Sequence, residues 1–593
     1  MENRRNERPI VCIDAEGDAG EMGLLGVAFY DGENGFYIRN KEEIVDRLLY
    51  YASQGYDFVA HNAQYDLVVI FWQLDISAQA VFYNQRFNHG RWFYNKEKPA
   101  ARIWDTLSIS AFLSLANVGK AIGIPKLETP CNLLGELCES PHWYCDRHNI
   151  GECEDCYAIR DAEICFAYYT QYKALLAEYA VPPKHTLGSA AVSLWKKLDP
   201  NQADYIKSKE IAEFIRESFH GGRTEPFKYG HTGTVYTADI QSMYPSIMLN
   251  NPMPDTRHLE YTESENIPIE VFRFEGVSEC LVTSPPAYIP LLPAYLQEKL
   301  LFPVGTFRGV WTHVELRASI AAGYSIQKVY RSLITRKSCT PFTHYITTLV
   351  ELRNRYKELN DPRELVAKIL ANSLYGRMGL KSHQEESIYV RWDGRKPLSE
   401  YGGWDIDIQH NGTFLTHTIE RNQVSHDANI LWASYITSLA RIRLYEFLIL
   451  QGSNIIYCDT DSIYSLAPIV GTGSGFGNLI AEETFDRGYF KGPKLYRLES
   501  DIGENKVRAR GVPKKYANEF LDSGHASFKQ PLTVKDALKR RMNAGEWVLM
   551  SRTQQLTMSK RQVLSPESLF TPNGYSETAP LFIGLDGDIF GEW

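Results

Sequence analysis

Short apolar runs mark the strands that this chain is expected to form. They are rich in β-branched and aromatic residues, and they lie at 9–14 (PIVCID), 57–60 (DFVA) and 232–240 (TGTVYTADI). A further β-prone run, NIIYCDTDSIYS, places Asp459 and Asp461 one residue apart. Two carboxylates this close repel each other, so the run predicts either a tight structural turn or a hairpin that binds a cation.

Apolar residues three or four positions apart predict helices elsewhere. Residues 362–379 (PRELVAKILANSLYGRMG) follow this pattern, with Pro362 suited to the first turn. Residues 428–449 form a longer amphipathic helix, and the segment 190–220 is also predicted to be helical. The helix at 428–449 leads directly into the strand that carries Asp459.

Two stretches with glycines separate these elements. Residues 381–425 alternate between apolar and polar positions around Gly turns, which predicts an inserted β-hairpin excursion. The run GTGSGFG at 471–477 lacks the Lys and the strand–loop–helix setting of a phosphate-binding loop. We therefore interpret it as a flexible linker.

Length, composition and net charge limit the classes of protein to which this chain can belong. At 593 residues the chain is too long for one core, and its 44% hydrophobic and 23% charged content is that of a soluble globular protein. A net charge of −9 argues against a generally basic nucleic-acid binder, although local clefts can still be positive. We find no secretory signal and no run of about 20 apolar residues. An intracellular, cytoplasmic location away from membranes is expected, with the ten cysteines as thiols or metal ligands.

Acidic residues recur beside the predicted elements of the first third of the chain. Asp14 and Glu16 lie two apart on a predicted strand and hence on one face. Asp66 follows in HNAQYD, and the helix-spaced pair Tyr157 and Asp161 places a phenol beside a carboxylate. Taken singly, each acid has a simpler interpretation as a surface carboxylate or a helix cap.

A second acidic set lies later in the chain. Asp239 ends the predicted strand at 232–240, and Asp459 and Asp461 follow more than two hundred positions later. Each set suits a two-metal phosphoryl-transfer site, because carboxylates hold Mg²⁺ and Mg²⁺ stabilises charge on phosphate oxygens. Lys368, on the helix between the members of the second set, suits the charge of a triphosphate.

A cluster of cysteines and histidines lies just before Tyr157. The run CESPHWYCDRHNIGECEDC at 138–156 has the pairs Cys145-x-x-His148 and Cys153-x-x-Cys156, which have the ligand spacing of a zinc knuckle. A structural Zn²⁺ is one hypothesis, and incidental thiols in a polar loop are the other.

The order of these motifs resembles that of the family-B DNA polymerases with a proofreading 3′–5′ exonuclease. DAE, HNAQYD and YAIRD are similar to the exonuclease motifs, and DIQSMYPSI, KILANSLYG and YCDTDS to the polymerase motifs, over about residues 9–515. The resemblance implies a mixed α/β (α+β) multidomain fold, with a ribonuclease-H-like exonuclease domain and a right-hand polymerase of palm, fingers and thumb.

The resemblance also implies the metal ligands and catalytic residues of both sites. Each site would hold two Mg²⁺ (or Mn²⁺) ions, and the polymerase ligands would be Asp239, Ile240, Asp459 and Asp461. The exonuclease ligands would be Asp14, Glu16 and Asp161, with Asp66 and Tyr157 as further catalytic residues. Lys126 would be either the phosphate-stabilising lysine of this site or a lysine without a role in it, because its spacing after the SLANV motif does not decide between the two.

Within family B, the chain is most similar to the protein-primed polymerases of small phages and linear plasmids. SFHGG (218–222) takes the place of a Tyr-x-Gly-Gly motif, with Phe219 in place of the Tyr. SLANV (114–118) resembles a Ser-Leu-x-x-hydrophobic motif, and PKLYR (493–497) a Lys-x-Tyr motif. The expected contacts with DNA, primer end or priming protein are Ser114, Leu115, Gly221, Gly222, Lys494 and Tyr496.

Further roles follow from the resemblance. Tyr244 is similar to the steric gate that excludes a 2′-hydroxyl, and the nucleotide contacts would be Tyr244, Lys368, Asn372, Tyr375 and Arg353. Arg355, Lys357, Arg510 and Lys514 are basic residues for which phosphate contact and simple solvation are both open. His61, Asn62 and Tyr65 would hold the unpaired primer end, where a ring can stack on a base, or else form a satisfied core pair.

The implied domain order is exonuclease 1–185, linker and first palm part 186–250, first insertion 251–345, fingers 346–380, second insertion 381–427, palm 428–490, and thumb with tail 491–593. The first insertion would dock the priming protein, and the second would give processivity and strand displacement. The expected partners are template-primer DNA, dNTPs and a terminal priming protein, bound to a monomer.

Three alternatives stay open. A family-B polymerase could start synthesis with no primer, the polymerase half could be inactive beside a working nuclease, or the chain could bind DNA without catalysis. A reverse transcriptase also pairs aspartates near a Tyr, but it lacks the exonuclease acids and the NSLYG helix.

Overall fold

The fold is known from a computed structural model. It describes residues 8–17, 24–63, 65–66, 70, 90–95, 98–127, 152–200, 206–264, 266–296, 298–380, 384–391, 397–409, 412–421, 428–531, 540, 547–553, 560–565, 574–583 and 589–590. Within these ranges, no helix combines the length and the apolar character needed to cross a membrane.

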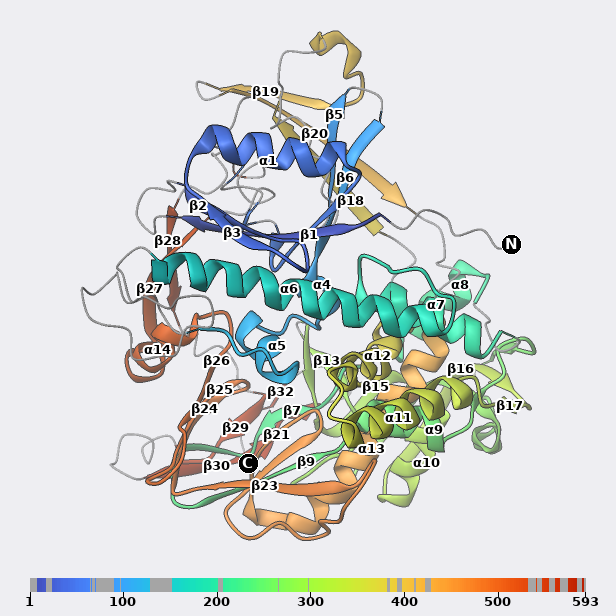
Figure 1. Ribbon diagram of the computed structural model, residues 1–593. Coiled ribbons are helices and arrows are strands. Elements are labelled where there is room, and N and C mark those ends of the chain that lie inside the picture. The colour runs from blue at the N-terminus through green and yellow to red at the C-terminus, as the bar shows by residue number, and fades with distance from the viewer. Residues whose placement is uncertain are drawn as a thin grey trace.

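A six-stranded sheet with helices on both faces forms the N-terminal part (Figure 1). Its order is β3 (Gly35–Ile38), β2 (Leu24–Tyr30), β1 (Ile10–Gly17), β4 (Asp57–Ala60), β6 (Lys98–Asp105) and β5 (Gly90–Asn95). Helix α1 (Lys41–Ser53) covers one face, and the long α6 (Glu152–Glu178) covers the other.

Alternation along β1 decides which side chains meet which helix. Val11 and Ile13 share a core with Ile44 of α1, whereas Cys12 packs with the core of α6. Because successive side chains of a strand point to opposite faces, Asp14 lies on the α6 side with Cys12. This places the first acidic set between the sheet and α6.

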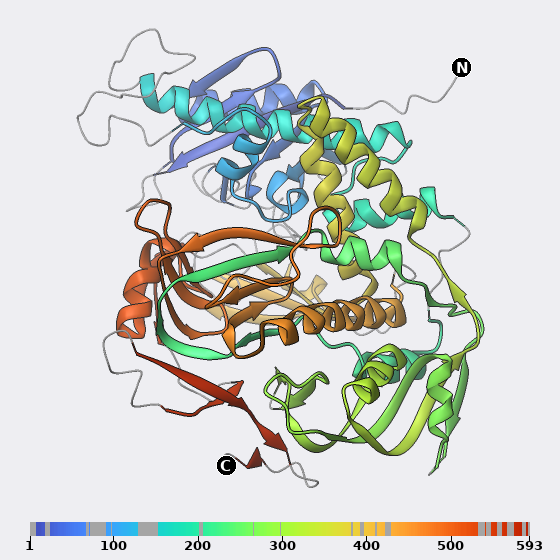
Figure 2. The same cartoon turned by 90° about the horizontal axis from the view of Figure 1, so that it is seen from below.

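The second sheet holds the later acidic set. Its order is β23 (Leu479–Phe485), β9 (Val235–Ile240), β22 (Ser462–Ser465), β21 (Ile455–Asp459) and β7 (Thr224–Pro226) (Figure 2). Ala238, Ile240 and Cys458 pack in one core with helices α9 (Met243–Asn250) and α13 (Ile430–Gln451). Strand alternation therefore turns Asp239 and Asp459 to the opposite face, away from these helices.

Two antiparallel helices lie in the sequence between strands β9 and β21 of the second sheet. Helices α11 (Thr343–Glu358) and α12 (Arg363–Met378) pack on each other, and α12 also packs on α6 and on α7 (Leu187–Leu198). A shorter helix, α8 (Lys209–Glu217), precedes the second sheet and packs on α13. Pro362 occupies the N-cap position of α12.

A further sheet interrupts the region between Asp239 and α11. Strands β11 (Glu260–Glu263), β16 (Ser325–Thr335), β12 (Glu275–Ser284) and β15 (Val304–Thr312) pair in that order, and helix α10 (His313–Ala321) packs against them. In the later excursion, β18 (Gln384–Arg391), β20 (Gly412–Arg421) and β19 (Asp405–Gln409) form three antiparallel strands rather than a single hairpin.

The C-terminal part contributes strands to more than one sheet. Strands β24 (Arg487–Gly492), β25 (Leu495–Glu499) and β26 (Lys506–Ala509), with helix α14 (Ala517–Ser523), follow the second sheet. The chain then returns, so that β30 (Tyr575–Pro580) pairs with β8 (Lys228–Thr232), and β31 (Phe582–Ile583) adds to β15. The tail thus connects the sheet of β8 and β24–β26 to the sheet of the first insertion.

Two candidate active sites

The first candidate site lies where β9 meets the β21–β22 hairpin. Asp239 is the register partner of Ser462, and the amide of Ile240 donates to the carbonyl oxygen of Asp461 over 2.8 Å. Acids separated by more than two hundred positions are therefore neighbours across two strands. The predicted convergence of the second acidic set is found, and the long-range pairing of β9 with β22 produces it.

The turn between Asp459 and Asp461 is tightly held. Thr460 has a left-handed backbone with φ of 63°, and its amide donates to the carbonyl oxygen of Arg223 over 2.7 Å. The hydroxyl of Thr224 donates to Asp459 Oδ1 over 2.8 Å. Strand β7 thus fixes both the backbone of the turn and one of its carboxylates.

Burial and mutual repulsion raise the pKa values of the acids at this site. Burial, followed by the charges of Asp461 and Glu482, raises the pKa of Asp239 to about 7. Burial and the neighbouring Asp459 raise the pKa of Asp461 to about 6. Raised carboxyl pKa values of this origin fall when a divalent cation binds, so the arrangement suits a cation.

Cationic side chains surround these acids. Lys494 Nζ lies 3.3 Å from Asp459 Oδ1, and its backbone amide donates to the hydroxyl of Tyr457. Lys368 is exposed on α12, and its charge lowers the pKa of Asp239, as does that of Lys506. Lys506 was missed in the sequence, as was the acidic Glu482 on β23, because only the sheet order brings them to the site.

Two stacked tyrosines close one side of the site. The ring of Tyr244, from the first turn of α9, lies 3.9 Å from the ring of Tyr375 of α12, with an interplanar angle of 21°. Asn372, one turn before Tyr375, donates to the carbonyl oxygen of Lys368 over 2.9 Å. The three predicted residues of α12 therefore share one face that looks toward Tyr244 and Asp239.

The basic residues of α11 have different surroundings. Arg353 Nε pairs with Glu364 at 2.7 Å, and its guanidinium reaches the hydroxyl of Ser242 at 3.5 Å, beside the site. Arg355 instead pairs with Glu178 at the end of α6, and Lys357 is exposed. Arg353 is thus the one of these three that approaches the predicted nucleotide site.

The second candidate site lies between β1 and α6. The amide of Ala15 donates to Asp66 Oδ1 over 2.8 Å. Burial, followed by the charges of Asp161, Asp66 and Glu16, raises the pKa of Asp14 well above its usual range, and burial raises that of Asp66 to about 8. All four acids of the first set therefore converge, as the motif spacing predicts.

Lys126 completes this second site. Its ammonium group donates to Asp161 and lies 4.3 Å from the ring centre of Tyr157, one helical turn earlier on α6. The sequence left the role of this lysine undecided, because its distance from the acids along the chain carries no spatial information. The fold places it directly among them.

The donor sets of both sites fit divalent cations in their chemistry. In the described part of the chain, no three His, Cys, Asp or Glu side chains stand as a preformed ligand set, and Lys126 engages Asp161 while Thr224 engages Asp459. Asp66 Oδ2 and Asp161 Oδ1, however, are buried without a hydrogen-bond donor. Buried, unsatisfied carboxylate oxygens among like charges are ligands that a hard cation would satisfy.

The predicted primer-end residues have mixed positions. Tyr65 is 37% exposed and its pKa is raised by burial and by the nearby Asp66, so its ring borders the acidic site. Asn62 is exposed in a left-handed conformation, and its amide donates to Asp105. His61 Nδ1 lies 2.9 Å from the hydroxyl of Thr106, and burial lowers its pKa to about 4, which is the pattern of a satisfied, neutral histidine.

The two residues of the Ser-Leu pair have different surroundings, with Ser114 exposed and Leu115 buried. Ser114 accepts from the amide of Asn117 as the N-cap of α5 (Leu115–Ala121), and Leu115 is buried in the core. The neighbouring Phe112 is 74% exposed because its backbone is left-handed, with φ of 60°. The sequence pattern did not predict that this apolar side chain would be exposed.

Three other predicted contacts lie close to the β21–β22 turn. Gly221 is exposed, and a Cβ on Gly222 would lie 2.9 Å from a methyl group of Thr460. Tyr496 is 3% exposed, and its hydroxyl hydrogen-bonds with that of Tyr464 at 3.0 Å. Tyr496 therefore supports the hairpin from within the core, whereas the sequence predicts a primer contact.

The remaining predicted residues are two basic residues near the C-terminus and the possible zinc ligands. Arg510 and Lys514 are exposed after β26. Cys145 and His148 of the predicted zinc knuckle lie outside the described residues, as does the side chain of Cys153. Cys156 is buried on α6 at 4% exposure.

Comparisons with known proteins identify the family of this chain. Residues 154–454 match the family model of DNA polymerase type B, organellar and viral. A probable DNA polymerase of Ascobolus immersus is 24% identical over 376 residues, which is 60% of this chain and 30% of that protein. One of Agaricus bitorquis is 23% identical over 59% of this chain and 48% of its own length. The DNA polymerase of Bacillus phage Nf is 25% identical over 42% of each chain.

The fold has solved counterparts. Phi29 DNA polymerase complexed with primer-template DNA superposes with a TM-score of 0.66 at 16% identity, covering 93% of this chain and all of the other. The α/β multidomain fold is therefore that of this polymerase. The present chain spans less than half the length of the curated relatives it matches. Because the family model covers half of the chain, including Asp161, Asp239 and α12, this chain belongs to the type B DNA polymerases of the organellar and viral kind.

Proposed function

We propose that this protein is a template-directed DNA polymerase with a proofreading 3′–5′ exonuclease. The observation that carries the proposal is the pairing of β9 with the β21–β22 hairpin, which brings Asp239 beside Asp461. A protein of the same family that only bound DNA would have no need for three costly carboxylates on one partly buried face. Template and primer DNA and the four dNTPs are the proposed substrates.

Asp239, Asp459 and Asp461, with the backbone at Ile240, would hold two Mg²⁺ or Mn²⁺ ions, which supply charge stabilisation on the attacking and leaving oxygens of phosphoryl transfer. Lys368 and Arg353 are placed to meet the triphosphate, and Asn372 holds the backbone of Lys368. The Tyr244–Tyr375 stack would form the floor under the sugar and base of the nucleotide. Lys494, beside Asp459, would hold the primer phosphate near its 3′ end.

The acids between β1 and α6 would hydrolyse mispaired 3′ ends. Asp14, Glu16 and Asp161 are the proposed metal ligands, Asp66 is a further catalytic residue, and Tyr157 would orient the attacking water. Lys126 would stabilise the phosphate charge once Asp161 turns to a cation. Tyr65, exposed at the rim, would stack on the frayed base.

The domain limits follow from these assignments. We assign the exonuclease to residues 1–185, the palm to 186–250 and 428–490, and the fingers to 346–380. The insertions are 251–345 and 381–427, and the thumb begins at 491. The tail strand β31 contributes to the first insertion rather than to the thumb.

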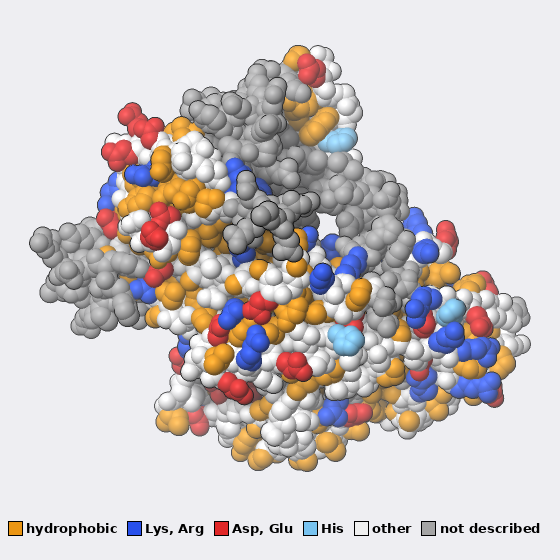
Figure 3. Space-filling model, turned by 45° about the vertical axis from the view of Figure 1, so that its right-hand side comes forward, with side chains coloured by type: hydrophobic (Ala, Val, Ile, Leu, Met, Phe, Trp, Pro, Cys, Tyr) orange, Lys and Arg blue, Asp and Glu red, His pale blue; other side chains and the backbone are white. Residues whose placement is uncertain are grey.

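Protein priming is the favoured way of initiation. Figure 3 shows Lys and Arg side chains gathered on the right-hand side of the view, the side on which the β12–β16 sheet lies. Arg308 and Arg331 on this sheet share Glu279, and Arg331 also lies 3.6 Å from a carboxylate oxygen of Glu217. This surface would suit an acidic face of a separate priming protein, whose hydroxyl would accept the first nucleotide.

The alternative is a polymerase that needs no primer, and one experiment separates the two. Protein purified as a monomer is given template, dNTPs and Mg²⁺, with and without the product of a neighbouring small reading frame. Protein priming predicts a nucleotide covalently bound to the added protein and no product without it. Products formed from template and dNTPs alone would favour the alternative.

The proposed polymerase and exonuclease activities are tested on an annealed primer-template. The proposal predicts Mg²⁺-dependent primer extension that follows the template, and stepwise shortening of the primer when dNTPs are left out. A preparation that binds the DNA but neither extends nor shortens it would contradict the proposal.

A further inference from the structure

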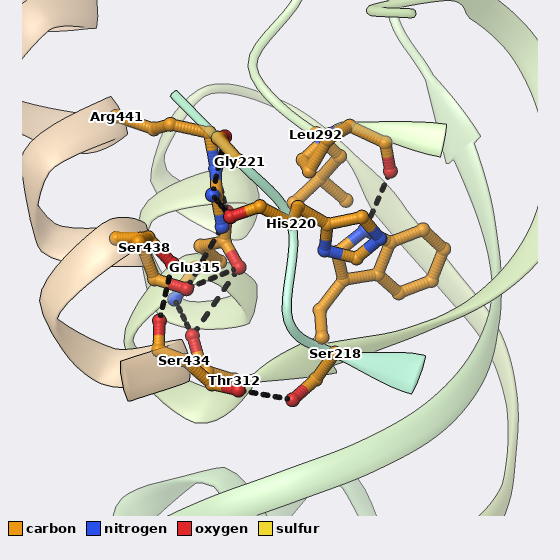
Figure 4. Close-up of polar contacts among 12 residues, drawn as sticks. Ser218, His220, Gly221, Leu292, Thr312, Glu315, Ser434, Ser438 and Arg441 are labelled. Atoms are coloured by element: carbon orange, nitrogen blue, oxygen red, sulfur yellow. Dashed lines mark hydrogen bonds and ion pairs between the residues drawn. The ribbon is translucent and has the colours of Figure 1, made fainter. Parts of the chain in front are cut away.

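A buried ion pair connects the first insertion with the palm. Glu315, in the first turn of α10, accepts from Arg441 of α13 at 2.7 and 3.0 Å, and both side chains are 1% exposed. The second carboxylate oxygen of Glu315 accepts from the hydroxyls of Ser438 at 2.7 Å and Thr312 at 3.3 Å (Figure 4). Every oxygen of this carboxylate is thus satisfied inside the protein.

The same arginine holds a segment that the catalytic acids depend on. We call residues 218–224 the strap, which joins α8 to strand β7. Arg441 donates to the carbonyl oxygen of His220, and to that of Gly221 over 2.9 Å, so its fork lies between Glu315 and the strap (Figure 4). Ser218, at the start of the strap, donates to Ser434 of α13 over 3.2 Å.

The strap ends against the turn of the β21–β22 hairpin. A Cβ on Gly222 would lie 2.9 Å from one side-chain atom of Thr460 and 3.0 Å from another, so the side chain of Thr460 packs on Gly222 where a larger residue would crowd it. The next two residues bind the turn through the Arg223 carbonyl and the Thr224 hydroxyl, which donates to Asp459. Hydrogen bonds at both ends of the strap, joined by its backbone, therefore connect Glu315 with Asp459.

A buried ion pair is a poor way to gain stability, because desolvating the two charges offsets most of their attraction. Its distinctive property is geometric. A planar guanidinium fixes several acceptors at once in one arrangement, which a flexible ammonium cannot do. Here the acceptors are one carboxylate of the insertion and two carbonyl oxygens of the strap.

We propose that Glu315 is a positioning residue for polymerisation. Through Arg441 it sets the register of the strap, and the strap in turn sets the positions of Thr460 and Asp459. The inference rests on the proposed polymerase function of the Asp239–Asp461 site. It also implies that the insertion at 251–345 contributes to nucleotide incorporation even when no priming protein is bound.

Two variants separate positioning from plain stability. Glu315→Gln keeps the size of the side chain but leaves Arg441 without a counter-ion. Arg441→Lys keeps the opposite charges and loses the fork that holds both carbonyl oxygens. Glu446→Gln is the matched control, because it breaks an exposed ion pair with Arg443 on the same helix α13.

Primer extension and hydrogen exchange are measured on the full chain. Both variants are expected to lower kcat for incorporation about tenfold and to raise the Mg²⁺ concentration required, with KM for the nucleotide and 3′-end hydrolysis unchanged. Amide exchange in the peptide covering 455–465 is expected to speed up, and in that covering 10–17 to stay unchanged. Glu446→Gln should match the wild type in every respect.

Two outcomes would overturn the inference. One is a pair of folded variants, judged by intact 3′-end hydrolysis, with wild-type kcat and wild-type exchange at 455–465. The other is a fall in melting temperature without either change, which would make the pair merely structural. If the wild-type protein incorporates no nucleotide, the proposed function fails, and the exchange at 455–465 still decides whether Glu315 positions the turn.

Discussion

Tyr244 and Tyr375 stack face to face, with ring centres 3.9 Å apart, although one ring comes from α9 and the other from α12. The left-handed residue Ser242, with φ of 55°, lies directly before α9. In the proposed polymerase, this stack would lie under the sugar of the nucleotide and exclude a 2′-hydroxyl.

Shortening Tyr244 is expected to relax the choice of sugar. In Tyr244→Val, the ratio of kcat/KM for dNTP over rNTP should fall by about 100-fold, because the ring that meets the 2′-hydroxyl is gone. Tyr244→Phe keeps the ring and serves as the control, with a ratio near that of the wild type. Single-nucleotide incorporation kinetics measure both, and an unchanged ratio in the valine variant would remove Tyr244 from the pocket.

The raised carboxyl pKa values predict how stability depends on pH and Mg²⁺. Burial and mutual repulsion raise the pKa of Asp239 to about 7 and that of Asp461 to about 6. The metal-free folded chain therefore binds more protons than the unfolded chain, so this stabilisation is present below about pH 4 and is lost as pH rises to about 7.

The melting temperature measures this effect. In EDTA, the wild type should lose more stability between about pH 5 and pH 7.5 than Asp239→Asn does. Added Mg²⁺ should raise the melting temperature more at the higher pH, because the ligands are then ionised. An equal effect of Mg²⁺ at both values would mean that the cation binds elsewhere.

Substitutions at the β1–α6 site should separate the two activities. Asp14→Ala is expected to lower 3′-end hydrolysis by about 100-fold or more, since the charge stabilisation by the bound cation is lost. Primer extension on a matched end should be kept, because Asp239 and its neighbours belong to another sheet. Labelled single-stranded and annealed primers report both reactions, and equal loss of both would mean that the sites are not independent.

The Cys/His cluster predicts a bound zinc ion. Elemental analysis of protein purified without chelators should find about one zinc per chain, and Cys145→Ser should lower that value. Cys339→Ser is the control, because this half-buried thiol lies far from the cluster in sequence. A wild-type protein without zinc would leave the cluster as ordinary thiols.

The spacing of apolar residues predicted helices and strands correctly where either helical spacing or strict alternation is clear. The strands that carry Asp14 and Asp239 and the helices that carry Lys368 and Asp161 lie where alternation and helical spacing predict them. The convergence of Asp239 with Asp461 was inferred from the order of motifs. Only the pairing of β9 with β22 brings them together in space.

Residues whose roles depend on long-range pairing were not predictable. Thr224, Glu482 and Lys506 reach the catalytic acids through strand neighbours that the sequence does not specify. The return of the C-terminal strand β31 to the sheet of the first insertion was missed for the same reason. The burial of Tyr496 against Tyr464 was likewise not predictable, because the motif that suggested a primer contact carries no information on packing.

The most direct test of the account is primer extension by Asp461→Ala, with 3′-end hydrolysis measured on the same preparation. We predict that Mg²⁺-dependent incorporation is lost while stepwise shortening of the primer continues at the wild-type rate. Incorporation that survives in a folded Asp461→Ala protein would contradict the assignment of the Asp239–Asp461 face as the polymerase site.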